Sequence, residues 1–241
     1  MTEAAHDTAA HHPIESAHST PAHRPAEAAH TAATRRSYDT VAVDYERLLA
    51  DQLATTPLDR AMIAGFVEKV EAAGGPRTIG DLGCGTGRVT SHLRDLGAEA
   101  FGVDLSPGMV AVARDTYPGL RFEVGSMTAL ALSDASLGGV LSWYSTVHMP
   151  EDELAACFAE FRRVLAPGGH ALIAFKVGDE RVRLERAYGH EVTLDVYRWS
   201  PDRLAGLLSA AGLVESARLV REPDPAESTP QAFLLARRPR G

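Results

Sequence analysis

The architecture of this chain is indicated most clearly by one segment, Ile79-Gly80-Asp81-Leu82-Gly83-Cys84-Gly85-Thr86-Gly87-Arg88. It follows a predicted strand and opens a predicted helix. Three glycines at alternate positions let the backbone turn sharply and approach a ligand at a distance that a Cβ atom would prevent. The turn also points the free N–H groups at the start of the helix towards that ligand.

Short apolar runs flank this segment and alternate with stretches of helical periodicity. The expected strands are 78–82, 99–103, 120–124, 138–143 and 170–177, followed by a closing pair at 214–221 and 231–237. Alternation of this kind is typical of successive βαβ units. We therefore expect a doubly wound sheet of about seven strands, mostly parallel with an antiparallel closing strand, and helices on both faces.

The expected helices have recognisable starts and stops. Thr56, Ser106 and Ser200 each precede a proline, which suits the cap and the first turn of a helix. Residues 150–165 carry an apolar stripe at helical spacing, and Pro167-Gly168-Gly169 is expected to turn the chain into the next strand.

Residues 1–34 have almost no large apolar side chains, so we expect a disordered tail followed by a single domain over 35–241. Within that domain, 35–75 should form cap helices and 178–199 an insertion that covers the substrate. Six histidines of the tail could be metal ligands, but low-complexity drift explains them better, because no cysteine or paired carboxylate accompanies them. They are His6, His11, His12, His18, His23 and His30.

The amino-acid composition limits the classes of partner and the cellular location that we expect for this chain. A formal charge of −8 argues against a nucleic-acid binder, which needs clustered Lys and Arg. The only two cysteines, Cys84 and Cys157, indicate neither a zinc site nor a disulfide framework. No signal peptide or membrane-spanning stretch is predicted, so we expect a cytoplasmic protein with no membrane partner. Whether it forms a homodimer is left open.

Two carboxylates frame the glycine segment. Asp81 ends the strand before it and is suited to hold a positively charged amine. Asp104 ends the next strand, where folds of this type hydrogen-bond the ribose hydroxyls of an adenosine cofactor.

From about Ser37 to Pro239 the chain resembles the class I methyltransferases that use S-adenosylmethionine (SAM), in particular the ubiquinone/menaquinone-biosynthesis-like (type 11) group of small-molecule enzymes. The resemblance rests on five segments in order: 81–87, 102–109, 125–127, 141–148 and 165–169. It implies a Rossmann-like fold, SAM as cofactor and no metal. The implied cofactor-binding residues are Tyr38, Tyr45, Asp81, Gly83, Cys84, Gly85, Gly87, Asp104, Leu105, Met109, Ser126, Met127 and Trp143.

Ser126 departs from the family pattern, because many relatives have aspartate there. The polar contact to the adenine amino group would then come from another group, such as the backbone.

Two alternatives to a methyltransferase stand. An NAD-dependent oxidoreductase also combines glycines with a ribose carboxylate, but its fingerprint is G-x-G-x-x-G, whereas this loop is G-x-G-x-G. A carboxylate at Asp81 would also repel a pyrophosphate. A SAM-binding protein without catalytic activity is the second alternative.

Methyl transfer is an in-line displacement that depends mostly on positioning. A base is needed only where the acceptor is protonated, and His148, four residues after Tyr144, is the candidate for that task. Tyr144 is the second residue that we expect in the catalytic part of the site. It is equally consistent with the sequence that His148 only lines the pocket or contacts the cofactor. Tyr38 and Tyr45 resemble the family's aromatic lid over the methionine end of SAM, with core packing as the alternative.

The acceptor is not determined by these motifs, because variable caps select substrates in this fold. We expect a small molecule with an oxygen, nitrogen or carbon nucleophile. His190, Tyr197 and Arg198 lie in the expected cover and could bind a polar acceptor, although alternation of apolar residues indicates that part of the cover is an ordinary strand.

Overall fold

The computed structural model describes residues 28–225 and 227–241. In this part of the chain, seven strands form one sheet in the order β3-β2-β1-β4-β5-β9-β8. Strands β1 to β5 run parallel, and β9 is antiparallel to its neighbours β5 and β8. The strands are β1 Ile79–Leu82, β2 Ala100–Asp104, β3 Arg121–Val124, β4 Leu137–Trp143, β5 Leu165–Lys176, β8 Val214–Arg221 and β9 Gln231–Arg237. The predicted fold class is confirmed.

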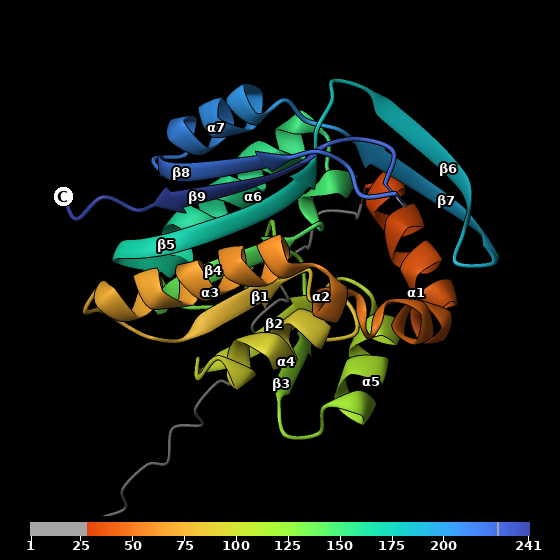
Figure 1. Cartoon of the computed structure of the whole chain (residues 1–241), viewed down its shortest axis with the longest axis horizontal. Coiled ribbons are helices and arrows are strands. Elements are labelled where there is room, and N and C mark those ends of the chain that lie inside the picture. Colours follow the sequence, from red (N-terminus) through yellow and green to blue (C-terminus); the bar gives the residue numbers. More distant parts are fainter. Residues whose placement is uncertain (1–27, 226) are drawn as a thin grey trace, which may run out of the picture.

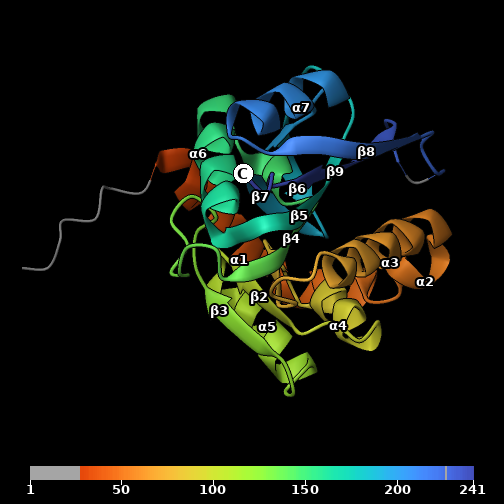
Figure 2. The same cartoon turned by 90° about the vertical axis from the view of Figure 1, so that its left-hand side faces the viewer.

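Helices cover both faces of the sheet (Figure 1). Figure 2 shows α3 and α4 on one side, with α6 and α7 on the other. Helix α5 packs against β2 and β3. The helices are α1 Ala29–Leu49, α2 Gln52–Thr55, α3 Pro57–Ala72, α4 Arg88–Asp95, α5 Pro107–Thr116, α6 Glu151–Val164, α7 Pro201–Ala210 and the short 3-10 helix η1 Thr146–His148. Strands β1 and β4 are buried along their whole length, as expected for parallel strands covered on both faces.

Helix starts follow the sequence signals at two of three positions. The Ser106 hydroxyl accepts a hydrogen bond from the Met109 N–H at 3.0 Å, and the Ser200 hydroxyl accepts one from the Arg203 N–H at 3.2 Å. Thr56 does precede α3, but its hydroxyl makes no cap bond. It donates instead to the carbonyl of Gln52 at 3.2 Å, in the short helix before it.

The predicted turn at 167–169 is a bulge within β5. Leu137 of β4 pairs with Leu165, while Gly139 pairs with His170, so extra residues of β5 loop out between the two pairs. Gly168 has a φ of +87° and donates its N–H to the carbonyl of Arg238 at 2.8 Å. Because this bond ties the bulge to the end of β9, the strand continues through it.

Helix α1 begins at Ala29, earlier than the predicted boundary at Arg35. Alanines favour a helix here, and contacts with α6 hold its first turn. Thr31 donates a hydrogen bond to Glu153 at 3.2 Å, and the His30 ring lies 3.0 Å from the same carboxylate. The rest of the predicted tail, residues 1–27 with five of its histidines, lies outside the described residues.

The predicted cover is a two-stranded hairpin, β6 Arg181–Ala187 and β7 His190–Tyr197. Tyr188 and Gly189 form its turn with φ values of +53° and +86°, as a tight hairpin turn requires. Apolar side chains of β7 pack against the buried side of α1, and the two elements lie side by side in Figure 1.

No helix in the described part of the chain has the length and apolar character to cross a bilayer. Those same residues contain no group of three or more His, Cys, Asp or Glu side chains that could hold a metal ion.

Candidate active site

The glycine segment forms a tight loop between β1 and α4. Gly83, Gly85 and Gly87 have φ values of +79°, +55° and +86°, a region that side chains disfavour. The N–H groups of Gly83 and Cys84 donate to the carbonyl of Val103 at 2.7 and 3.1 Å. These bonds fix the loop to the end of β2, so its position relative to the second strand is set.

The three glycines face different surroundings. A Cβ atom on Gly83 would lie 2.2 Å from the Ser145 Cβ, and one on Gly87 would lie 2.6 Å from the ring of Phe122. At Gly85 the nearest atom would be 3.9 Å away, on the ring of Tyr45. A side chain on Gly85 would therefore meet protein atoms only at an ordinary van der Waals distance, so Gly85 is the glycine of this loop whose backbone a ligand can approach most easily.

Asp81 lies at the end of β1 and is fully buried. Its Oδ2 accepts a hydrogen bond from the Thr90 hydroxyl at 2.6 Å, while its Oδ1 has no partner in the described residues. Burial raises the pKa of this carboxyl to about 7, although the Thr90 bond works in the opposite direction. A cationic group next to Oδ1 would supply the missing partner and favour the ionised form.

Asp104 holds the end of β2 and both sides of the site together. Its Oδ2 accepts from the Gly85 N–H and its Oδ1 from the Ser106 N–H, each at 2.8 Å. Burial raises the pKa of this carboxyl. Each carboxylate oxygen has a second lone pair, so both can still accept from the hydroxyls of a ribose.

Four rings form a row above the glycine loop. Tyr188 lies 4.9 Å from Tyr45, Tyr45 lies 6.2 Å from Tyr38, and Tyr38 lies 5.3 Å from His148, measured between ring centroids. The rings of each pair are steeply inclined to one another. The row comes from α1, the hairpin turn and η1, and this convergence supports the predicted aromatic lid.

His148 is held at both ring nitrogens. Nδ1 lies 2.8 Å from the carbonyl oxygen of Asp195, and Nε2 lies 2.7 Å from the Tyr38 hydroxyl. A carbonyl can only accept, so Nδ1 carries the proton and Nε2 accepts from Tyr38. Burial lowers the pKa of His148 to about 4, helped by the nearby charge of Lys176. The imidazole is therefore neutral near pH 7, and its basic nitrogen faces Tyr38.

Comparison with known proteins fits this geometry. Residues 79–169, which contain the glycine loop, Asp104 and His148, match the family model described as "Methyltransferase domain". The part of the chain that carries the candidate site is thus similar to methyltransferase domains.

Curated relatives of this chain show the same similarity. Demethylmenaquinone methyltransferase of Chlorobaculum parvum is 33% identical over 144 residues, which make up 58% of this chain and 58% of that protein. The chain thus matches somewhat more than half the length of this curated relative. These matches support the methyltransferase expectation and give no support to an NAD-dependent oxidoreductase.

Solved structures share the fold. The 1,6-didemethyltoxoflavin-N1-methyltransferase of Burkholderia thailandensis, solved with 1,6-didemethyltoxoflavin and S-adenosylhomocysteine, has a TM-score of 0.64 and 21% identity, covering 91% of this chain and 94% of that one. The magnesium protoporphyrin IX methyltransferase of Synechocystis, solved with SAM, has a TM-score of 0.65 and 15% identity, covering 89% of this chain and all of that one.

The other residues that were predicted to bind the cofactor differ in where their side chains lie. Cys84 turns into the core towards Gly102, and Met109 is buried between α1, α5 and β7. Both can face a ligand only through their backbone. The Ser126 hydroxyl is bonded to Thr128 at 2.9 Å. Met127 borders the glycine loop near Ser145, and Leu105 is half-buried after β2.

Trp143 and Tyr144 disagree with the predicted roles. Tyr144 has a φ of +56°, so two consecutive side chains point to the α3 side of the sheet. Trp143 is 7% exposed and packs against Phe233 at 5.3 Å, which leaves no surface for a cofactor. Burial raises the pKa of Tyr144, and the charges of Asp59 and Arg221 act on the same hydroxyl, which has no hydrogen-bond partner among the described residues.

The three predicted substrate residues do not converge. His190 bonds to Asp44 of α1 at 2.8 Å, and Tyr197 stacks on Trp199 with ring centroids 6.0 Å apart. Arg198 is paired with Glu180 at 2.5 Å. His190 therefore joins the hairpin to α1, and Tyr197 helps to anchor its base.

Several residues of the site were not predicted. Asp39 of α1 accepts from the Ser106 hydroxyl at 2.6 Å and from the Gly108 N–H at 2.9 Å, so it caps α5 from another helix. The Asp195 carbonyl orients His148. No local pattern marks these residues, because their partners are distant in sequence.

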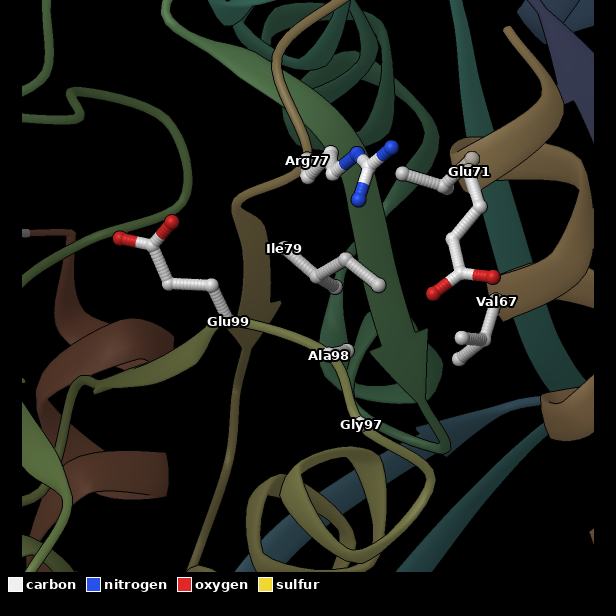
Figure 3. A pocket seen from close by; sticks show the side chains of 8 residues that line it. Val67, Glu71, Arg77, Ile79, Gly97, Ala98 and Glu99 are labelled. Carbon is white, nitrogen blue, oxygen red and sulfur yellow. The ribbon is translucent and has the colours of Figure 1, made fainter.

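A separate cavity of about 130 Å³ lies at the opposite end of β1 (Figure 3). It is bordered by Ile79 and by side chains of α3, together with the segment between α4 and β2. None of the predicted site residues lines it.

Proposed function

We propose that this chain transfers the methyl group of SAM to a small-molecule acceptor. The observation that carries the proposal is the loop of three alternate glycines between two carboxylates, the fully buried Asp81 and the half-buried Asp104, with Gly85 the least crowded of the three glycines. The proposal treats residues from α1 to β9 as one domain, acting in the cytoplasm.

The residues present fit SAM better than a dinucleotide. Asp81 offers an unpartnered buried oxygen, which suits the ammonium of a methionine moiety and repels a pyrophosphate. Asp104 offers lone pairs for ribose hydroxyls. The ring of Tyr45 is the nearest group across from Gly85, so it would cover a ligand bound there.

When bound, SAM supplies an electrophilic methyl group on a sulfonium. The chain's own residues then have two tasks, to hold the acceptor in line and to exclude water. Correct positioning alone can contribute about 7–11 kcal/mol to lowering the barrier. Helix α1 and the hairpin serve these tasks, because they close over the loop through Tyr38, Tyr45 and Tyr188.

His148 can act on the acceptor only through Tyr38 or after Tyr38 moves, because the Tyr38 hydroxyl occupies its basic nitrogen. We propose that the pair works as a unit in which His148 holds the hydroxyl proton and Tyr38 turns its lone pairs towards the cleft. If His148 acts as a base, turnover should fall on the acid side of the pH profile as the ring takes up a proton. The lowered pKa of His148 moves this fall from near pH 6.5 to near pH 4.

The acceptor we propose is a small molecule, bound without nucleic acid or membrane. Relatives and structural neighbours named for menaquinone, toxoflavin and magnesium protoporphyrin substrates are consistent with this class. A homodimer is compatible with this proposal but is not required by it.

Calorimetry tests the proposal. SAM and S-adenosylhomocysteine should bind and NAD should not. Asp104→Ala should lower the SAM affinity at least tenfold, since a charge-assisted hydrogen bond contributes about 1.5–3 kcal/mol. Binding of NAD without SAM would refute the cofactor assignment. Methyl-labelled SAM incubated with a metabolite extract then identifies the acceptor by mass spectrometry.

A further inference from the structure

Lysine is rare in this chain. Of 24 lysine and arginine residues, only two are lysines, Lys69 and Lys176. Lys69 is exposed on α3, whereas Lys176 is half-buried at the last position of β5. Lys176 therefore occupies the carboxyl edge of the sheet, where ligands of open α/β sheets bind.

The side chain of Lys176 belongs to the α3 side of the sheet. Leu172 and Ala174 of the same strand pack in the core beneath α3, and alternation along a strand places Lys176 on that face too. Lys176 pairs with Gln231 of β9, which pairs with Arg221 of β8. A row of polar side chains thus crosses three strands at this edge.

The arginines in this region have carboxylate partners. Arg221 binds both oxygens of Glu227 at 2.6 and 2.8 Å, and Arg198 binds Glu180 at 2.5 Å. Lys176 has no ion pair or hydrogen bond from its ammonium to any described residue. Burial and the neighbouring charge of Arg198 lower its pKa.

The charge of Lys176 acts on the candidate active site. This charge helps to lower the pKa of His148, and it also helps to lower the pKa of Glu227. On the same face, the hydroxyl of Tyr144 is buried without a hydrogen bond. The carboxyl ends of β4 and β5 thus carry two polar groups on the α3 face that have no hydrogen-bond partner among the described residues.

A partly buried ammonium without a partner is unfavourable, because no ion pair compensates the free-energy cost of removing its charge from water. A ligand that brings an anionic oxygen would relieve this cost. We propose that Lys176 binds a carboxylate group of the methyl acceptor. The proposal rests on the proposed function and adds the class of acceptor, a small organic acid.

The methionine carboxylate of SAM has the same chemistry and is the competing source of the anion. Lys176→Met separates the two, because it keeps the length of the side chain and removes the charge. S-Adenosylhomocysteine should bind this variant within twofold of the wild-type affinity. A loss of tenfold or more would assign Lys176 to the cofactor and overturn the proposal.

Benzoate is the probe for the acceptor site, with neutral benzamide as its match, because the two have nearly the same shape and differ in charge. Reductive methylation with ¹³C-formaldehyde labels both lysines and keeps their charge. With S-adenosylhomocysteine present, benzoate should shift the ¹³C NMR signal of the labelled Lys176, and benzamide should leave that signal unchanged. The Lys69 signal should stay in place, and Lys69→Met and Lys176→Met assign the two signals.

Calorimetry on the unlabelled proteins gives the second readout. Lys176→Met should bind benzoate at least tenfold more weakly than wild type, and Lys69→Met should bind it normally. Equal responses to benzoate and benzamide, or an unchanged benzoate affinity in Lys176→Met, would overturn the proposal. Failure of the wild type to bind S-adenosylhomocysteine would instead contradict the proposed function, so the two failures are distinguishable.

Discussion

At the scale of single residues, the glycines after β1 lack side chains for different reasons. Gly83 and Gly87 have protein atoms too close for a Cβ, whereas a Cβ on Gly85 would only touch the ring of Tyr45 at an ordinary contact distance. All three have positive φ values, so backbone conformation also favours glycine at each of these positions. The same backbone region at Tyr144 redirects a side chain away from the predicted site, which shows how one residue's torsion angle changes the composition of a cleft.

This difference predicts separate effects of two substitutions. Gly85→Ala should destabilise the fold by only about 1–2 kcal/mol, the cost of a left-handed alanine, yet weaken SAM binding at least tenfold. Gly83→Ala should destabilise by more, because its Cβ would meet Ser145. Thermal unfolding and calorimetry on both variants make the comparison. Normal SAM affinity in Gly85→Ala would show that no ligand approaches Gly85.

At the scale of elements, α1 connects separate parts of the site. Ser37 exchanges two hydrogen bonds with the backbone of Thr193 in β7, at 3.3 and 3.0 Å. Asp39 caps α5, Tyr38 binds His148, and His190 of the hairpin binds Asp44. Because these contacts join α1 to β7, α5 and η1, displacing this helix would open the whole cover.

The early start of α1 gives a testable consequence. Deleting residues 1–34 should lower the free energy of unfolding by about 1–2 kcal/mol relative to deleting 1–27, through loss of the Thr31–Glu153 bond and of the first helical turns. Denaturant titration of the two truncated proteins measures the difference. Equal stabilities would show that residues 28–34 contribute nothing to the fold.

At the scale of the whole molecule, burial of ionisable groups around the site couples stability to pH. His148 is neutral when folded, with a pKa of about 4, but takes up a proton near pH 6.5 when unfolded. The stability that comes from the neutral ring is therefore complete above about pH 6.5 and is lost as the pH falls towards 4.

We expect His148→Gln to remove part of this acid sensitivity. Between pH 6.5 and 4, the wild type should lose about 1–2 kcal/mol more unfolding free energy than the variant, since partial exposure of the ring reduces the full effect. Chemical denaturation at several pH values checks this. The other histidines are common to both proteins, so they cancel in the difference. Parallel pH curves would mean that His148 has an ordinary pKa in the folded protein.

Local sequence was sufficient for the strands, most helices and the glycine loop, because periodicity and turn chemistry depend on neighbouring residues. Asp81 and Asp104 were predictable for the same reason, since each lies at a fixed offset from the loop. The hairpin was predicted only in part, from the alternation of apolar residues in β7.

Only the tertiary structure determined which side chains meet. The contact of Tyr38 with His148 spans 110 positions, and Asp39 reaches α5 across 67. Trp143 faces α3 through the alternation of β4, and Tyr144 joins it there because of one backbone angle. Lys176 gained significance only because Arg198 and Arg221 have carboxylate partners while it has none in the described residues. Burial and pairing depend on packing between distant segments, and no local pattern in the chain encodes them.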